Sequence, residues 1–167
     1  TLNVRLVVTS RQPHLVVVDS QLDTPLDASL FIAGRACYIY AAVENDAKRL
    51  ALEARGATVV YLPAIDAGGQ ATGKVDLAAM LRDLAKREIN ELHVEAGHKL
   101  NGALIGAGLV DEFLVYLAPK MIGQGARMAN LEPLTELSQA VQLVFQSAEM
   151  IGPDLRIVAR APGRDRF

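Results

Sequence analysis

Apolar, β-branched runs alternate with amphipathic segments along most of the chain. Four early runs are rich in Val, Ile and Tyr and predict β-strands, at 4–9, 14–19, 37–42 and 58–62. Two segments with apolar residues at helical spacing predict helices, at 45–55 and 76–87. For the first helix, Asn45 is the expected amino-terminal cap and Gly56 the carboxyl-terminal cap. Its predicted apolar face consists of Ala47, Leu50, Ala51 and Ala54.

The remaining elements follow the same order. Glycines at 67–73 predict a loop before the second helix. The later segments predict a strand at 91–95, a helix at 99–107, a strand at 113–118, and an antiparallel pair at 141–146 and 154–159. Strand–helix–strand order predicts an α/β fold with parallel strands, and the final pair makes the expected sheet mixed. Neither an internal repeat nor a linker is visible, so we expect a single domain over 1–167.

Composition and charge exclude several classes of protein. The chain has 167 residues, enough for one domain with a sizeable core. Its net charge of -2 gives no general attraction for nucleic acid or for an anionic membrane surface. No apolar run reaches the roughly 18 residues of a membrane span, and the first residues lack the pattern of a secretory signal. We therefore expect a cytoplasmic protein without a nucleic-acid or membrane partner.

A metal site is not expected either. Cys37 is the only cysteine, which excludes an internal disulfide and a multi-thiolate zinc site, and its apolar neighbours predict a buried thiol. His93-Val94-Glu95 matches half of the zinc deaminase signature, but the Pro-Cys-x-x-Cys half is absent. Strand alternation would place His93 and Glu95 on one face of their strand. The three histidines show no metal-ligand spacing.

The segment from Glu95 onward is the strongest candidate for a binding site. A predicted strand ends at Glu95, Ala96-Gly97 forms a tight turn, and a helix begins at once. In open α/β sheets ligands lie beyond the carboxyl ends of parallel strands, and the free N–H groups of a helix start attract anions. Two interpretations stay open on spacing alone. Glu95 either faces a ligand, or it only complements the helix dipole while Gly97 turns the chain.

Two further positions also allow two interpretations. The glycine loop 123–127 follows a predicted strand, and its Arg127, or Lys120 before it, either meets a phosphate or is solvated at the surface. Ser20 comes at the end of the second predicted strand. Its hydroxyl either binds a cofactor phosphate or belongs to an ordinary turn.

Several segments, in the same order along the chain, resemble the signature of the riboflavin-biosynthesis pyrimidine reductases. This domain usually forms the carboxyl half of the bifunctional deaminase–reductase RibD. The central matches are 94–97, 100–104, 107–112 and 116–120. Outside them, the resemblance includes the loop 123–127, the strand and turn at 16–20 and 24–26, and the hairpin at 152–155. Many members carry Gly where Ala96 stands, a mild departure that should leave the turn intact.

The resemblance implies both a fold and a reaction. The implied fold is α/β of the dihydrofolate-reductase-like, three-layer kind, with a mixed, mostly parallel sheet flanked by helices. The implied reaction is the NADPH-dependent reduction of 5-amino-6-(5-phosphoribosylamino)uracil, a ribosylaminopyrimidine phosphate, to its ribitylamino product. The ribose, opened to its imine form, accepts a hydride at its first carbon. Family members are expected to form homodimers.

The resemblance also assigns roles to residues of this chain. Glu95 aligns with the family's substrate-contacting Glu, and we expect it to bind the ribityl chain and to assist proton transfer. Leu2 and Arg5 are the other expected substrate contacts, Arg5 as a phosphate ligand. The expected cofactor contacts are Ser20, Gly97, His98, Lys99, Leu100, Asn101, Gly102 and Ala103.

The resemblance begins inside a family motif. We therefore expect the first strand of the reductase domain, and the zinc deaminase domain, to be missing from this chain. Two alternatives stay open: a non-catalytic fragment that binds a nucleotide, and a related reductase of another pterin- or pyrimidine-like substrate. We expect no metal site in either alternative.

Overall fold

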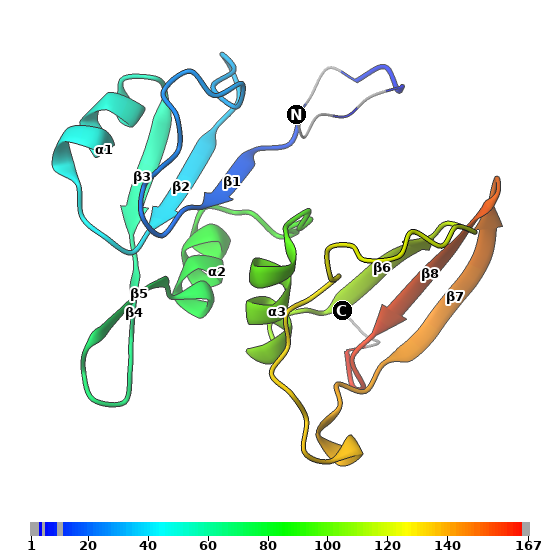
Figure 1. The fold of residues 1–167 in the computed structure, drawn as a ribbon. Helices are drawn as coiled ribbons and strands as arrows, with labels where there is room; N and C mark the ends of the chain where they lie inside the picture. Colours follow the sequence, from blue (N-terminus) through cyan, green and yellow to red (C-terminus); the bar gives the residue numbers. More distant parts are fainter. Residues whose placement is uncertain (1–3, 5, 10–11, 165–167) are drawn as a thin grey trace. The chain divides into compact units, whose positions relative to one another are not determined.

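Three parallel strands form the sheet of the first half of the protein. The computed structural model describes residues 4, 6–9 and 12–164. It divides the chain into two units, Thr1–Leu92 and His93–Phe167. The first unit contains β1 (Leu15–Val18), β2 (Cys37–Ala41) and β3 (Ala57–Tyr61), hydrogen-bonded in that order with both pairs parallel (Figure 1). These strands confirm the predictions at 14–19, 37–42 and 58–62.

The middle strand of this sheet supplies side chains to two cores. Ile39 and Ala41 point to one face and pack with Leu52 of α1 (Asp46–Glu53). Tyr40 points to the other face and packs with residues of α2 (Leu77–Lys86). The packed residues of α2 are Met80 and Leu84. The two helices therefore cover opposite faces of the sheet, as alternation along a buried strand requires.

The predicted cap Asn45 begins α1, and Asp76, the first residue of the second predicted helix, caps α2, but the buried face of α1 was predicted wrongly. Asn45 accepts a hydrogen bond from the Lys48 N–H, and Asp76 caps α2 in the same way. Leu52 is the fully buried residue of α1, whereas Leu50, in the predicted apolar face, is 59% exposed. The alanines of the predicted face bury little area, so one leucine decides how this short helix packs. The carboxyl-terminal cap is Ala54 rather than Gly56, which lies two residues further on with φ +92°.

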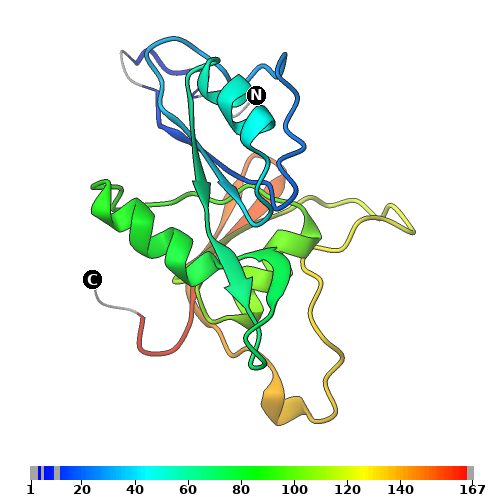
Figure 2. The ribbon, with the colours of Figure 1, turned by 90° about the vertical axis from the view of Figure 1, so that its left-hand side faces the viewer.

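A hairpin occupies the segment that was predicted as a glycine-rich loop. Its strands are β4 (Pro63–Ile65) and β5 (Ala71–Val75), paired antiparallel. The Asp66 carboxylate accepts hydrogen bonds from the N–H groups of Gly68 and Gln70, and Gly69 adopts φ +80°. Figure 2 shows β3 leading directly into this hairpin. The glycines therefore form the tip of a turn between two short strands.

A hydrogen bond from a buried tyrosine of β2 connects α2 to the sheet. The Tyr40 hydroxyl, on a side chain with no exposed area, donates a 2.7 Å hydrogen bond to Asp83 Oδ2. Arg87 donates to the same oxygen at 2.7 Å, and its guanidinium lies over the Tyr38 ring. Burial and the Asp83 carboxylate raise the pKa of Tyr40 well above its ordinary value. The hydrogen bond from Arg87 is the main cause that lowers the pKa of Asp83.

The described part of the second unit contains one α-helix and an antiparallel sheet. The helix is α3 (His98–Gly106), and the strands are β6 (Glu112–Leu117), β7 (Val144–Ile151) and β8 (Asp154–Arg160), in the order β6-β8-β7. The loop before β7 contains one short 3-10 helix, Leu137–Gln139. Gly152, at φ +61°, lies in the turn that joins β7 to β8, as the sequence predicts. The helix and strand predictions for 99–107, 113–118 and 154–159 are confirmed, and the strand predicted at 141–146 begins three residues later.

Ion pairs line one face of this sheet. Register places Glu112 opposite Arg160, and their side chains form a salt bridge at 2.8 Å. Arg156 pairs with Glu149 across β8 and β7. Phe113, on the other face of β6, lies opposite Ala159. The face with these ion pairs also carries Leu114 and Val158, while Phe113 and Ala159 lie on the opposite face.

Two strand predictions were wrong. Residues 91–95 form no strand and run as irregular chain between α2 and α3. Residues 6–9, within the predicted strand 4–9, likewise form none. Val8 is fully exposed, and β-branched propensity alone does not form a strand without a surface to pack on. The three-stranded sheet of the first unit is parallel, whereas the β4–β5 hairpin and the sheet of the second unit are antiparallel. Parallel and antiparallel pairing therefore occur in separate sheets rather than in one mixed sheet.

The described part of the chain contains no helix with the length and apolar composition needed to cross a membrane.

Cys37 is 2% exposed and packs in the core between the parallel sheet and α1, which confirms the predicted buried thiol. Burial raises the pKa of its thiol, against the opposing charge of Arg35.

We expect Asp83→Asn to lower the free energy of unfolding by about 1–2 kcal/mol at neutral pH, since both the Tyr40 and Arg87 hydrogen bonds lose a charged acceptor. Because the pKa of Asp83 is lowered on folding, this contribution is complete above the unfolded value of about 3.9 and is lost as the pH falls through the folded value. Urea unfolding curves at several pH values measure it. Glu53→Gln is the matched control, since Glu53 pairs with Arg49 at the same spacing without a buried tyrosine. Equal effects of both changes at neutral pH would contradict a role for Tyr40.

Candidate functional site

The segment from Glu95 to the start of α3 presents free backbone donors. Gly97 is the residue before the helix, with extended backbone at φ −75° and ψ 166°, and no side chain caps this end. The first N–H groups of a helix have no partner within it, and they carry a partial positive charge. An added Cβ at Gly97 would meet nothing within 4 Å. This end of α3 can therefore accept an anionic group close to its backbone.

Glu95 lies beside His93. His93 Nε2 is 3.4 Å from Glu95 Oε1, so the two side chains lie on the same side of the chain, although residues 91–95 do not form the strand on which that prediction rested. The contact is an ion pair only when the imidazole is protonated. A carboxylate in this place can accept a hydrogen bond from a hydroxyl or exchange a proton with a ligand.

Asn101 connects the turn before α3 with the loop after β6. Its side-chain nitrogen donates to the Ala96 carbonyl at 3.2 Å and to the Met128 carbonyl at 3.0 Å. A third bond runs from the Asn130 N–H to the His98 carbonyl at 2.8 Å. Residues 128–130 are therefore attached to the first turn of α3 by two hydrogen bonds, and Asn101 also binds the turn before the helix.

Gly102 lets this loop approach the helix. Gly102 is buried, and a Cβ built on it would lie 2.0 Å from the Asn130 carbonyl oxygen. Atoms that close must move apart, and the atom concerned belongs to the backbone. Only glycine therefore fits this position of α3 while the loop stays in place.

The structure brings together the residues predicted from 95 to 103. Lys99 and Ala103 have exposed side chains, and His98 and Leu100 are half-buried. Asn101 and Gly102 instead serve the contact with residues 128–130. Sequence reasoning missed Met128 and Asn130, which carry no recognisable motif. The only signal for them is a glycine inside a helix, which indicates a close approach but not the partner.

Ser20 lies at the carboxyl edge of the parallel sheet in the first unit. Its carbonyl accepts hydrogen bonds from the N–H groups of Ala42, at 3.0 Å, and Val43, at 3.1 Å. Within the residues that the structure describes, its hydroxyl makes no hydrogen bond, so it can meet a ligand. The carboxyl edge of parallel strands is the usual place for ligands in α/β proteins.

Asp19 holds the turn that follows Ser20. Its carboxylate accepts hydrogen bonds from the N–H groups of Asp23 and Thr24 and from the Thr24 hydroxyl, at 2.6 to 3.0 Å. Burial would raise the pKa of Asp19, but the bonds from Thr24 and Asp23 outweigh it and lower the pKa. Asp19 thus fixes the backbone on both sides of Ser20.

The other sequence-predicted residues divide into two groups. Leu2 and Arg5 lie outside the described residues. Lys120 and Arg127 are exposed on the loop after β6. Among the residues with a described position, no group of three His, Cys, Asp or Glu side chains is arranged to hold a metal ion.

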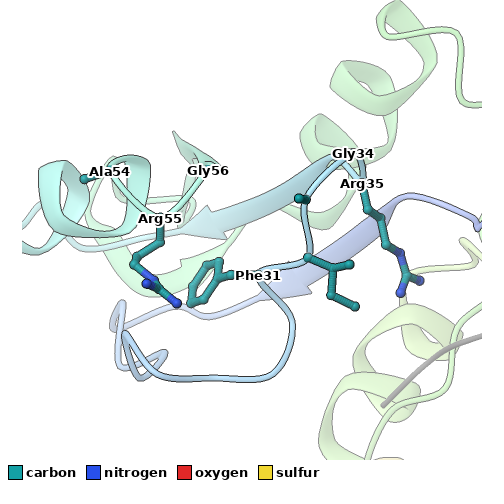
Figure 3. A pocket seen from close by; sticks show the side chains of 8 residues that line it. Phe31, Gly34, Arg35, Ala54, Arg55 and Gly56 are labelled. Carbon is teal, nitrogen blue, oxygen red and sulfur yellow. The ribbon is translucent and has the colours of Figure 1, made fainter.

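A hollow of about 350 Å³ lies elsewhere in the first unit (Figure 3). It is bordered by Phe31, Arg35 and Arg55, and the Arg55 guanidinium lies 5.7 Å from the centre of the Phe31 ring. Gly56 in its wall immediately precedes β3, so the hollow is at the amino ends of the parallel strands. Ligands of α/β sheets bind at the opposite ends, and the hollow is therefore not our candidate site.

Comparison with known proteins identifies relatives along nearly the whole chain. The family model of the RibD C-terminal domain matches residues 1–157. The riboflavin biosynthesis protein RibD of Escherichia coli is 35% identical over 147 residues, which are 87% of this chain and 37% of that protein. A protein of Buchnera aphidicola named 5-amino-6-(5-phosphoribosylamino)uracil reductase is 34% identical over 86 residues, covering 51% of this chain and 42% of that protein. The matched segments thus cover less than half the length of each of these two relatives.

A solved structure supports the same grouping at the level of the fold. RibD of Acinetobacter baumannii superimposes with a TM-score of 0.71 at 22% identity, over 90% of this chain and 38% of that chain. At this identity the likeness concerns the fold alone.

We expect Asp19→Asn to lower the free energy of unfolding by about 1–3 kcal/mol, because an amide cannot accept the three hydrogen bonds as a carboxylate does. The lowered pKa of Asp19 makes its contribution complete above about 3.9, and the contribution is lost as the pH falls through the folded value. Denaturant unfolding at neutral and acid pH tests this. The control is Asp23→Asn in the same turn. It removes a neighbouring charge, but the hydrogen bond of Asp23 to Asp19 is made by the backbone N–H and is kept. A similar loss in both variants would show that charge alone matters here.

Proposed function

The chain belongs to the RibD C-terminal domain family, and from this membership we propose that it catalyses the NADPH-dependent reduction of 5-amino-6-(5-phosphoribosylamino)uracil in riboflavin biosynthesis. The name of the Buchnera relative supports this substrate. The observation that carries the proposal is Glu95 next to a helix start that is free of side-chain caps. A carboxylate can bind a sugar hydroxyl or transfer a proton, and an anion-binding backbone can hold a phosphate of the cofactor.

The proposed reaction sets two tasks for the protein. When bound, NADPH supplies the hydride. The first carbon of the opened ribose gains that hydride while its nitrogen gains a proton, so the C=N bond becomes a C–N single bond. The protein aligns the two reacting carbons and provides a path for the proton. We assign hydrogen bonding to the ribityl chain, and help with this proton transfer, to Glu95.

The residues at the start of α3 fit a dinucleotide phosphate. Gly97 leaves open space at the helix start, and the first-turn N–H groups of α3 have no side-chain acceptor. We propose that the stretch from Gly97 to Ala103 forms the cofactor-binding turn and helix. Ser20, with its hydroxyl at the carboxyl edge of the parallel sheet, is a further proposed cofactor contact. Leu2 and Arg5 are proposed substrate contacts on the family resemblance.

The wider properties of the protein are proposals of the same kind. We propose one dihydrofolate-reductase-like domain with three layers, supported by the likeness to the RibD structure of Acinetobacter baumannii. We propose a cytoplasmic location from the composition of the chain and a homodimer from the family resemblance. The substrate is a small molecule, without a nucleic acid or a membrane as partner.

Glu95→Gln should lower turnover by about 100-fold or more, because an amide cannot exchange a proton as a carboxylate does. NADPH affinity should stay within about twofold, since the proposed contacts of Glu95 are with the substrate. Loss of NADPH absorbance measures turnover, and a fluorescence titration measures affinity, both on the full-length protein. Glu91→Gln, an exposed carboxylate four residues earlier, should leave both unchanged.

The same assay separates the alternatives. Unaltered turnover in Glu95→Gln removes Glu95 from the mechanism. NADPH binding without turnover on any tested ribosylaminopyrimidine phosphate would favour a nucleotide-binding protein. Turnover only with another pterin- or pyrimidine-like compound would favour a related reductase.

A further inference from the structure

We propose that Asn101 and Gly102 are positioning residues, which hold residues 128–130 against the first turn of α3 rather than bind the cofactor through their own atoms. This inference deepens the proposed function and rests on it for the effect on NADPH. It adds the loop after β6, with Arg127, to the site.

The donors of Asn101 are already used. A side-chain amide carries two N–H hydrogens. The Ala96 and Met128 carbonyls lie 3.2 Å and 3.0 Å from this nitrogen and accept both of them. Only the amide oxygen is left, and a phosphate needs donors. Asn101 is therefore unsuited to bind a cofactor phosphate and suited to join two pieces of backbone.

Gly102 acts on the same loop by a different physical route. Its position in α3 approaches the Asn130 backbone so closely that a Cβ would lie within 3 Å of three atoms of that residue. The Asn130 N–H donates to the His98 carbonyl one helical turn earlier. A hydrogen bond and a close backbone contact therefore fix Asn130, while Asn101 fixes Met128.

This arrangement sets the place of Arg127 relative to Glu95. Ala96 follows Glu95 directly, and Met128 follows Arg127 directly. Because one Asn101 nitrogen binds the carbonyls of Ala96 and Met128, the two backbones are held side by side. Without this link, the loop 123–127, with Gly123 at φ +65° and every residue exposed, has few contacts to hold it. Displacement of the loop would carry Arg127 away from the turn of Glu95.

The test uses Gly102→Ala, Asn101→Ala and their combination in the full-length protein. Gly106→Ala is the matched control, because it adds the same methyl group to the same helix where nothing lies within 4 Å. Amide hydrogen exchange is measured without NADPH on peptides covering 123–130, which contain the Asn130 N–H that donates to the His98 carbonyl. We expect both single variants to speed exchange of this amide by about tenfold, the effect of losing one hydrogen bond. Gly106→Ala should match the unchanged protein.

NADPH titration then tests how the two residues act. If both work by holding the same loop, the double variant should weaken NADPH binding no more than the weaker-binding single variant does. Separate, multiplying losses of affinity would mean that each residue touches the cofactor, and would overturn the proposal. Should Gly102→Ala fail to fold, Asn101→Ala still decides through its exchange rates.

The exchange result is independent of the reaction. Unchanged exchange at 123–130 in Asn101→Ala overturns the positioning role, whatever NADPH does. Faster exchange in a protein that never binds NADPH supports the positioning role and refutes the proposed function instead.

Discussion

Main-chain polar groups at the ends of helices and strands need partners, and meeting this need decides the local structure around the candidate site. The Ser20 carbonyl receives two N–H groups from the chain after β2. The carbonyls of Ala96 and Met128 both accept hydrogen bonds from the Asn101 side-chain amide. The His98 carbonyl accepts one from the Asn130 N–H. The start of α3 is the contrast, since its N–H groups have no side-chain acceptor. Among the α-helices in the described part of the chain, α3 is the one whose start has no side-chain cap, and there we place the anionic ligand.

Features governed by nearby residues were predictable from the sequence. Asn45 and Asp76 begin their helices because a side chain reaches an N–H only three residues away. The hairpin of β4 and β5 was not predicted, because glycines at 68 and 69 indicate a turn but not strands on either side. The segment 91–95 has strand-like composition but no strand, since composition does not specify a pairing partner.

Part of the candidate site was likewise predictable from the sequence and part was not. The turn at Glu95 and the helix after it could be found because they are contiguous in the sequence. The contact of Asn101 with Met128 spans 27 residues, and no local pattern predicts which loop meets which helix. The choice of a ribosylaminopyrimidine as substrate came from family resemblance. Geometry supplies the reason for particular residues, such as the absence of a side chain at Gly102.

The single thiol of the chain can be used to measure local opening of the structure by its rate of chemical labelling. Cys37 begins β2 under the α1 layer and is 2% exposed, so a thiol reagent reaches it only when that layer opens. Labelling kinetics then follow the opening of the first unit alone, since the second unit has no cysteine. A ligand that slows labelling would stabilise the first unit, and the chain needs no engineered probe to reveal it.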